Sequence, residues 1–381
     1  MESHESIERN RALTSMHAIF AVATLALAGC HNHVFFQDTG ARPVRLSDFQ
    51  EPATRVSLVR GKGYELAPTN RKRTSLLGDD RQYLLVDVGY LNPIVAFSNR
   101  TFDSMTSPDQ PYITKINSDG AGSVPPPPDR TDGRWTTQFS VPVAFHLFWD
   151  PFTANNPILD TDYTFGADLS VRGAIAEGLE LRVGSSYNHI STHVGDEYVI
   201  ANTNTTQGPF PFDRVNVSYW PIRAWSSLRY YAGCAPHFTW IVEVTGEVER
   251  IRSGHYELFP FEADPARVPL SPATTEGAVT IDVRQAKGIA LKPTSQQLSG
   301  YVRGSVTIAN RTVFPYHNGL TSAQKALQTN VVVGYVLPYR LRLGARQIML
   351  YSRYFAGPNP YGQFRNQKAT WFAGLGAAVI P

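Results

Sequence analysis

The chain has 381 residues and a nearly balanced charge, with 35 basic and 32 acidic side chains and a net charge of +3. This balance gives no electrostatic reason to expect a nucleic-acid partner, and the length allows one large domain or two smaller ones. Two cysteines are too few for the disulfide framework of a small secreted domain, so the fold must be held by its packing and strand pairing.

The start of the chain has the organisation of an export signal. A basic flank precedes the apolar stretch Met16–Leu27, which is too short to span a bilayer of about 30 Å but has the proportions of a signal peptide. The ending Leu27-Ala28-Gly29-Cys30 resembles the lipobox of bacterial lipoproteins, in which the cysteine becomes the acylated first residue. We therefore expect residues 1–29 to be a lipoprotein signal peptide and Cys30 to be lipidated. An ordinary signal peptide with a chance cysteine is the alternative.

Two segments that follow show no strand pattern. Residues 30–80 are mixed polar sequence with basic clusters, and they are predicted to be a tether or small periplasmic segment. Residues 103–134 include the run Pro125–Pro128, which cannot donate hydrogen bonds to a sheet and favours extended polyproline conformation. This second segment is predicted to be a loop within a β-domain that covers residues 81–381.

A two-residue alternation dominates the rest of the chain and is clearest in Tyr163–Arg172. Tyr163, Phe165 and Leu169 share one side of a strand there, while Asp168 and Arg172 share the other. The pattern recurs around Phe139–Trp149, Leu179–Val183, Phe238–Val248, Val279–Val283, Val302–Ile308 and Trp371–Val379. Charged groups therefore gather on the face opposite the apolar one. A soluble sheet would expose that face to water, and a membrane barrel would enclose it.

The expected connections favour the barrel. The segments Gly173–Gly178 and Pro338-Tyr339 are interpreted as short turns, whereas the links near 191–214, 250–276 and 355–368 are long. Short turns at one rim and long loops at the other are typical of outer-membrane barrels. We predict an all-β fold, an antiparallel transmembrane up-and-down β-barrel of 10–12 strands, with twelve favoured because single-chain bacterial barrels use an even number.

The charges on the enclosed face define a predicted lumen. In a narrow barrel they would pair across the interior and fill it, and in a wider one they would line water and set an ion preference. Ten to twelve strands give a narrow interior, so a mostly filled lumen is favoured over an open pore. The predicted lumen set is Asp168, Arg172, Glu180, Arg182, Arg223, Arg229, Glu243, Glu247, Glu249, Arg303, Arg340, Arg342 and Arg346.

Two segments carry a family resemblance. Residues Tyr187–Tyr198 (YNHISTHVGDEY) and Tyr354–Phe364 (YFAGPNPYGQF) resemble signatures of a bacterial family, the domain of unknown function numbered 1207, with looser support in Arg229–Gly233. Thr192 stands where the family pattern has its second serine. The resemblance implies an exported, barrel-like envelope protein and supplies no activity.

The first of these segments contains the one candidate for catalysis. A serine is activated when an adjacent base takes its proton and a third group orients that base. His189 and Ser191 share the lipid-facing side of a strand, an arrangement that resembles outer-membrane phospholipase A and the lipid A deacylases, and Asp196 is the candidate third member. Such a His-x-Ser pair also occurs by chance in a chain of this composition.

Other interpretations of the same segment stay open. His193, Gly195, Asp196 and Glu197 can form a strand-to-loop transition, with Gly195 allowing the turn and the polar side chains bonding to the backbone. Asp196 and Glu197, with His193, can also hold a divalent cation, although adjacent carboxylates are more often a solvated loop.

The leading hypothesis is therefore an outer-membrane envelope barrel of a Gram-negative bacterium with a structural or binding role. It would be lipid-anchored at Cys30, surrounded by outer-membrane lipids and inserted by the barrel-assembly machinery. A narrow channel and a lipid acyl hydrolase using His189 and Ser191 are the alternatives. No cofactor, metal site or nucleic-acid partner is predicted, and the oligomeric state stays open.

Overall fold

The computed structural model describes a set of β-strands and their immediate flanks. The described residues are Ser47, 53–62, 81–98, 102–103, 135–152, 158–176, 179–193, 214–232, 240–259, 266–269, 274–285, 301–313, 324–340, 347–361 and 370–380. Within these residues no helix is long and apolar enough to cross a membrane.

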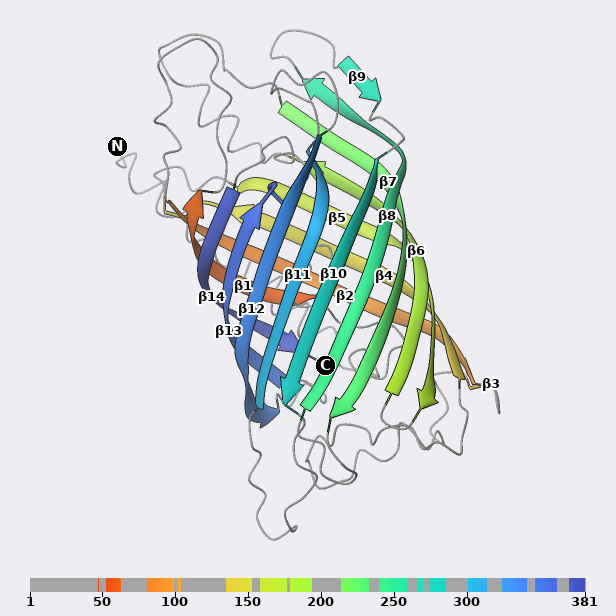
Figure 1. The fold of residues 1–381 in the computed structure, drawn as a ribbon. Helices are drawn as coiled ribbons and strands as arrows, with labels where there is room; N and C mark the ends of the chain where they lie inside the picture. Colours follow the sequence, from red (N-terminus) through yellow and green to blue (C-terminus); the bar gives the residue numbers. More distant parts are fainter. Residues whose placement is uncertain are drawn as a thin grey trace, which may run out of the picture.

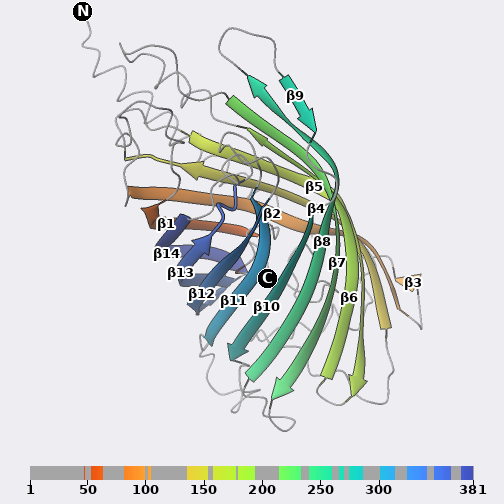
Figure 2. The same cartoon turned by 45° about the horizontal axis from the view of Figure 1, so that its top comes forward.

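One antiparallel sheet of fourteen strands makes up the fold, and twelve of its strands close into a barrel (Figure 1). The twelve are β1 (Thr54–Lys62), β2 (Arg81–Ser98), β4 (Trp135–Trp149), β5 (Ile158–Ala176), β6 (Leu179–His193), β7 (Arg214–Ala232), β8 (Trp240–Phe259), β10 (Thr275–Gln285), β11 (Tyr301–Val313), β12 (Gln324–Arg340), β13 (Gln347–Gly357) and β14 (Thr370–Ile380). Each pairs with its neighbours along the chain, which is the up-and-down topology and the strand number that the sequence predicts. The short strands β3 (Phe102–Asp103) and β9 (Ala266–Pro269) are not part of the ring. They pair with the last residues of β2 and β8, near opposite rims (Figure 2).

The first strand closes the ring. β1 pairs with β14 from Thr54 opposite Val379 to Lys62 opposite Trp371, and on its other side it pairs with β2. The prediction of a tether over residues 30–80 and a barrel over 81–381 is therefore wrong at this boundary. In β1 the pattern of polar side chains inside and apolar side chains outside breaks. The apolar Val59 faces inward, and the charged Arg60 faces outward. A pattern that assumes a polar interior does not recognise such a strand.

Side chains alternate between an enclosed polar face and an outer apolar face. In β5 the buried Asp168 and Ser170 alternate with the exposed Phe165 and Leu169, as the sequence predicts. The same division holds in most of the ring, apart from β1 and the strand ends near one rim. Exposed apolar side chains on the outer face include Val143, Tyr163, Leu228, Tyr230, Val244, Val248, Val279, Ile281, Val302, Ile308, Val333, Tyr335, Leu350, Tyr354 and Leu375.

The two rims differ in their connections. At the rim where β1 begins and β14 ends, here called the terminal rim, β5 and β6 are joined through residues 177–178 alone. The connection is short, as predicted, but Gly173–Ala176 of the predicted turn belong to β5. Pro338-Tyr339 is not a turn, because it lies within β12. The opposite rim, here called the loop rim, carries the long links 194–213, 260–274 and 358–369. The terminal rim does not carry short turns alone, since residues 99–134 link β2 to β4 and residues 286–300 link β10 to β11 there.

Candidate functional site

Many of the charged side chains inside the barrel are paired with one another. Arg229 donates to Glu243 through Nε (2.9 Å) and Nη2 (2.7 Å), while Ser227 donates to the other oxygen of Glu243 at 2.6 Å. Arg182 bonds to Glu180 and approaches Glu243 at 3.9 Å. Since a buried charge without a counter-charge is costly, the alternation of arginine and carboxylate across β6, β7 and β8 lets these strands enclose ionised groups.

The pairing continues along the same wall. Arg223 lies 3.2 Å from Glu247 and 2.8 Å from Glu249. Two further pairs join β10 to β11: Arg303 with Asp282 and Arg311 with Glu276, each at 3.0 Å. The predicted lumen set is thus buried at Asp168, Glu180, Arg182, Arg223, Arg229, Glu243, Glu247, Glu249 and Arg303, and half-buried at Arg172. The side chain of Arg340 and residues Arg342 and Arg346 lie outside the described residues.

A second charged group lies across the ring on β1, β2 and β4. Arg55 bonds to Asp87, whose other oxygen accepts a 2.8 Å hydrogen bond from Nδ1–H of His146. The strand register places Asp162 of β5 directly opposite His146. All of these side chains are buried. The imidazole of His146 therefore stands between two carboxylates, one bonded to it and one on the neighbouring strand.

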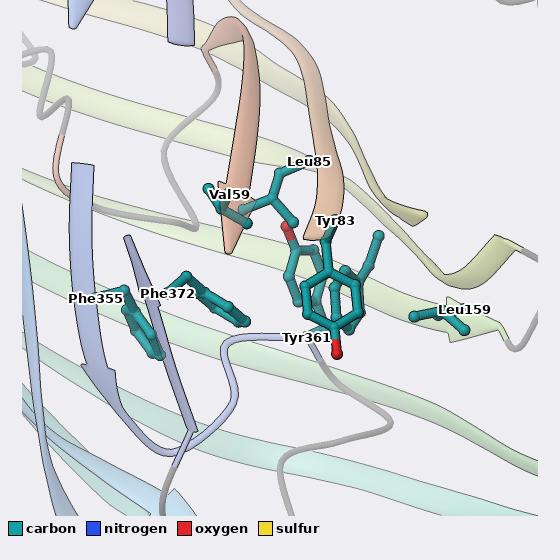
Figure 3. Packing of buried hydrophobic residues seen from close by; sticks show 8 residues of the cluster. Val59, Tyr83, Leu85, Leu159, Phe355, Tyr361 and Phe372 are labelled. Carbon is teal, nitrogen blue, oxygen red and sulfur yellow. The ribbon is translucent and has the colours of Figure 1, made fainter. Parts of the chain in front are cut away.

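An aromatic cluster lies on the inner face of the barrel near the loop rim (Figure 3). Its members are Val59, Tyr83, Leu85, Phe148, Leu159, Phe355, Tyr361 and Phe372, all with 2% or less of their surface exposed. They come from the ends of β1, β4 and β13 and from the beginnings of β2, β5 and β14, apart from Tyr361. These side chains thus form an apolar patch on the inner face of six neighbouring strands, β13, β14, β1, β2, β4 and β5.

Tyr361 enters this cluster from the connection between β13 and β14. Its ring stacks on Phe148, with centroids 4.9 Å apart and planes at 8°, and Phe148 also packs on Tyr83 at 4.9 Å. Burial raises the pKa of the Tyr361 phenol above its ordinary value, so the ring stays neutral at physiological pH. We call residues 358–361 the latch, because they fold from the wall into the interior.

Local sequence explains how the latch leaves the strand. Gly357 has φ of +138°, and a Cβ atom there would lie 2.6 Å from the Cα of Gln328, so only glycine fits. Asn359 then accepts a hydrogen bond from the backbone N–H of Tyr361 at 2.9 Å, a local turn that directs the tyrosine inward. No sequence pattern marks Tyr361 as functional, although the residue lies in the second segment of family resemblance.

The two segments of family resemblance meet at one small cavity. Its volume is about 20 Å³, and it is lined by His146, Asp162, Thr164, Ile190, Tyr219, Pro360 and Tyr361. Ile190 belongs to the first segment, whereas Pro360 and Tyr361 belong to the second. This volume is enough for a single water molecule, so little space remains beneath the latch.

The predicted catalytic pair lies outside the barrel. His189 and Ser191 are half-buried on the outer face of β6, as the alternation predicts. The imidazole of His189 packs between Trp220 and Phe165, with ring centroids at 4.4 and 5.1 Å, and Tyr187 stacks on Trp220. These contacts place His189 in an aromatic cluster of the outer surface. Its catalytic role stays a prediction.

Several predicted site residues lie outside the described residues. These are the lipidation site Cys30, the proposed third catalytic member Asp196, and the loop residues Gly195 and Glu197. His193 is the last residue of β6, opposite Thr161. Among the described residues no group of three or more histidine, cysteine, aspartate or glutamate side chains is arranged to hold a metal ion.

Comparison with known proteins gives structural similarity only. No family model and no curated protein sequence matches the chain, so the resemblance to the domain of unknown function 1207 stays a hypothesis based on its two segments. Similar solved structures include the translocator domain of the autotransporter NalP from Neisseria meningitidis, at 7% identity, with 97% of each chain covered and a TM-score of 0.40.

Two other solved structures are similar at the same level. The transport unit of the autotransporter AIDA-I from Escherichia coli is 10% identical, with 92% of this chain and 96% of that chain covered and a TM-score of 0.37. The toluene transporter TbuX from Ralstonia pickettii is 7% identical, with 92% and 95% covered and a TM-score of 0.34. Scores this low carry no conclusion about function.

Proposed function

We propose that the protein is an outer-membrane β-barrel of the Gram-negative cell envelope, with a structural or binding role and a closed lumen. The observation that carries the membrane assignment is the division of side chains between the two faces of one closed sheet. The outer face exposes a continuous apolar surface that would associate in water, while the inner face holds the charged groups.

The contents of the lumen support a closed barrel over an open channel. Arginines on β6, β7 and β11 are bonded to carboxylates within the wall, so these charges compensate one another and need no ion from solution. At the loop rim the aromatic cluster and the latch occupy the interior, and the cavity beside them holds about one water. Conduction through this arrangement would require the latch to move out of the barrel interior.

The proposal also states how the protein is anchored and to which family it is related. We infer that a signal peptide over residues 1–29 directs export and that Cys30 is acylated, because the sequence there resembles a lipobox. We further propose that the chain is related to the domain of unknown function 1207. The meeting of both resembling segments at one cavity supports this relation, since it gives the two distant segments a shared structural role.

Two measurements test the proposal. The mature protein should fractionate with outer membranes and resist alkaline extraction, and recovery as a soluble periplasmic species would refute the membrane assignment. In planar bilayers the purified barrel should give no stable conductance, because the lumen is closed. Steady ion conductance by the wild-type protein would instead favour the narrow channel.

A further inference from the structure

A groove lies on the outer face of the barrel, where β7, β8, β10, β11 and β12 run side by side (Figure 1). Its volume of about 750 Å³ falls within the range of roughly 300–1,000 Å³ that is typical of small-molecule sites. The outer face of a barrel usually carries a continuous layer of apolar side chains, so a hollow of this size needs a local cause in the sequence.

Small residues form the floor of the groove. Gly246 of β8 and Gly277 of β10 face outward on adjacent strands. A Cβ atom at Gly246 would meet nothing within 4 Å, and one at Gly277 would meet only the backbone oxygen of Glu247, at 3.8 Å. Ala224 and Ser226 continue the floor onto β7. The described chain therefore leaves the space above both glycines open.

Larger apolar side chains border this floor. Each has between 50% and 66% of its surface exposed, and each belongs to the outer face of its strand. Hydrocarbon walls of this kind offer dispersion contacts and few hydrogen-bonding groups, which suits an alkyl chain better than a polar ligand. The bordering residues are Val248, Val279, Ile308 and Leu327.

Two cations meet at the end of the groove that points toward the loop rim. Arg250 follows Val248 by two residues on β8, is exposed on the same face, and lies directly opposite Thr275 of β10. The exposed Lys325 of β12 donates through Nζ to the backbone carbonyl of Thr275 and to the hydroxyl of Thr312, at 2.7 Å from the latter. The two positive charges therefore approach Thr275 from opposite sides.

Aromatic residues lie at the same level of the barrel wall. Tyr187 of β6 is directly opposite Ile222 of β7, which is directly opposite Arg250. The ring of Tyr187 stacks on Trp220, with centroids 5.2 Å apart. Aromatic side chains of barrels gather where the bilayer meets its headgroups. In the proposed membrane, the cations would lie at headgroup level and the groove would lie beside the acyl chains.

We propose that this groove binds one anionic lipid, with an acyl chain above Gly246 and Gly277 and the phosphate between Arg250 and Lys325. A guanidinium can donate two hydrogen bonds to one phosphate, and an ammonium adds a second positive charge. The site thus joins an apolar groove to a phosphate-sized cationic end. This inference rests on the proposed membrane location and adds a particular lipid partner to it.

Lipid retention in detergent tests the site. Purified barrel is incubated with equal amounts of phosphatidylglycerol and phosphatidylcholine that carry identical acyl chains, and bound lipid is counted by native mass spectrometry. The wild type should retain one phosphatidylglycerol with a several-fold preference over phosphatidylcholine. Arg250→Gln/Lys325→Gln should lose this preference, and Arg250→Gln alone should weaken it. Equal retention of both lipids by the wild type would overturn the proposal.

Matched variants separate the groove from general effects. Gly246→Leu fills the floor and should reduce retention of both lipids several-fold. Gly304→Leu is its control, because a Cβ atom at Gly304 on β11 also has only ordinary contacts, at 3.8 Å or more, and Gly304 does not line the groove. Arg60→Gln is the control for charge, since Arg60 is exposed on the distant β1. Unchanged retention in folded Gly246→Leu would contradict the site.

The lipid test is separable from the test of membrane location. A barrel that fractionates with outer membranes but retains both lipids equally would overturn the site and leave the proposed function standing. Recovery of the mature protein as a soluble periplasmic species would refute the membrane assignment and this site together. Heat-modifiable mobility shows that each variant is folded before its bound lipid is counted.

Discussion

At the scale of single residues, the lumen buries side chains in two different ways, as ion pairs and as an apolar cluster. Arginine and carboxylate pairs cost desolvation and recover it by mutual attraction, while the aromatic cluster excludes water and gains from apolar burial. Tyr361 stands where the two meet, because its ring stacks on Phe148 and it also lines the cavity beside His146 and Asp162. Substitutions here should separate closure of the lumen from stability of the wall.

Tyr361→Ala should open the loop rim. The change removes a buried ring from the aromatic cluster, which we expect to cost about 3–5 kcal/mol of stability and to raise conductance in planar bilayers. Tyr354→Ala is the control, because Tyr354 is an exposed tyrosine on the outer face of the preceding strand. Unchanged conductance with a folded Tyr361→Ala barrel would show that the latch does not close the lumen.

Arg229→Leu should destabilise the barrel by about 3–5 kcal/mol, because Glu243 would lose the guanidinium that bonds it at 2.7 and 2.9 Å. The double variant Arg229→Leu/Glu243→Leu should recover part of this loss, since no buried carboxylate is left without that partner. Urea midpoints read from heat-modifiable gel mobility measure both effects. Arg250→Leu is the control, because Arg250 is exposed on β8. We expect it to lower the urea midpoint less than Arg229→Leu does.

Ser191→Ala tests the catalytic alternative. We expect the purified wild-type barrel to show no acyl hydrolysis of phospholipids, and the variant to fold with unchanged heat-modifiable mobility, because a half-buried surface hydroxyl contributes little stability. Hydrolysis by the wild type that disappears in Ser191→Ala would identify a serine hydrolase. Hydrolysis that survives the substitution would exclude this serine and require another site.

At the scale of elements, strand β1 shows where sequence patterns succeed and where they fail. The alternation recognised β4, β5, β6, β8, β10, β11 and β14, because their inner faces are polar and their outer faces apolar. It missed β1, whose Val59 joins the interior cluster while Arg60 points outward. The sequence pattern also did not predict the latch. Its inward course depends on Gly357 and on packing against the distant Phe148, and hydrophobic periodicity does not report contacts between residues far apart in the sequence.

Glycines on β14 control how closely β1 can approach. A Cβ atom at Gly374 would lie 2.1 Å from the backbone oxygen of Leu58, so Gly374→Val should disrupt pairing between β1 and β14. We expect loss of heat-modifiable mobility and increased protease sensitivity. Gly246 on β8 is the matched control, since a Cβ atom there meets nothing within 4 Å, and Gly246→Val should fold normally. Normal folding of Gly374→Val would show that this contact does not limit closure.

At the scale of the whole molecule, the proposed location joins two independent features, an apolar outer wall and an expected lipid on Cys30. The wall follows from the described strands, whereas lipidation rests on the sequence of the export signal. Barrel insertion does not need the acyl chain, because the apolar face alone favours the bilayer. The two features should therefore separate experimentally.

Cys30→Ser should abolish metabolic labelling with a radioactive fatty acid while leaving the barrel in the outer membrane. Labelling is measured after purification of the protein, and insertion by resistance to alkaline extraction and by heat-modifiable mobility. Cys234→Ser is the control, because it changes the only other cysteine and should keep the label. Persistence of the label in Cys30→Ser would disprove acylation at this residue.

The pairing of β1 with β14 also dictates an order of events during biogenesis. This seam joins Thr54 to Val379, so its two edges are separated by nearly the whole chain, and forming such distant contacts early carries the largest entropic cost. Neighbouring hairpins can form first, and the seam must wait until the C-terminal strand has been synthesised and exported. Until then β1 and the growing sheet expose unpaired edges, and such edges are prone to pair with other chains.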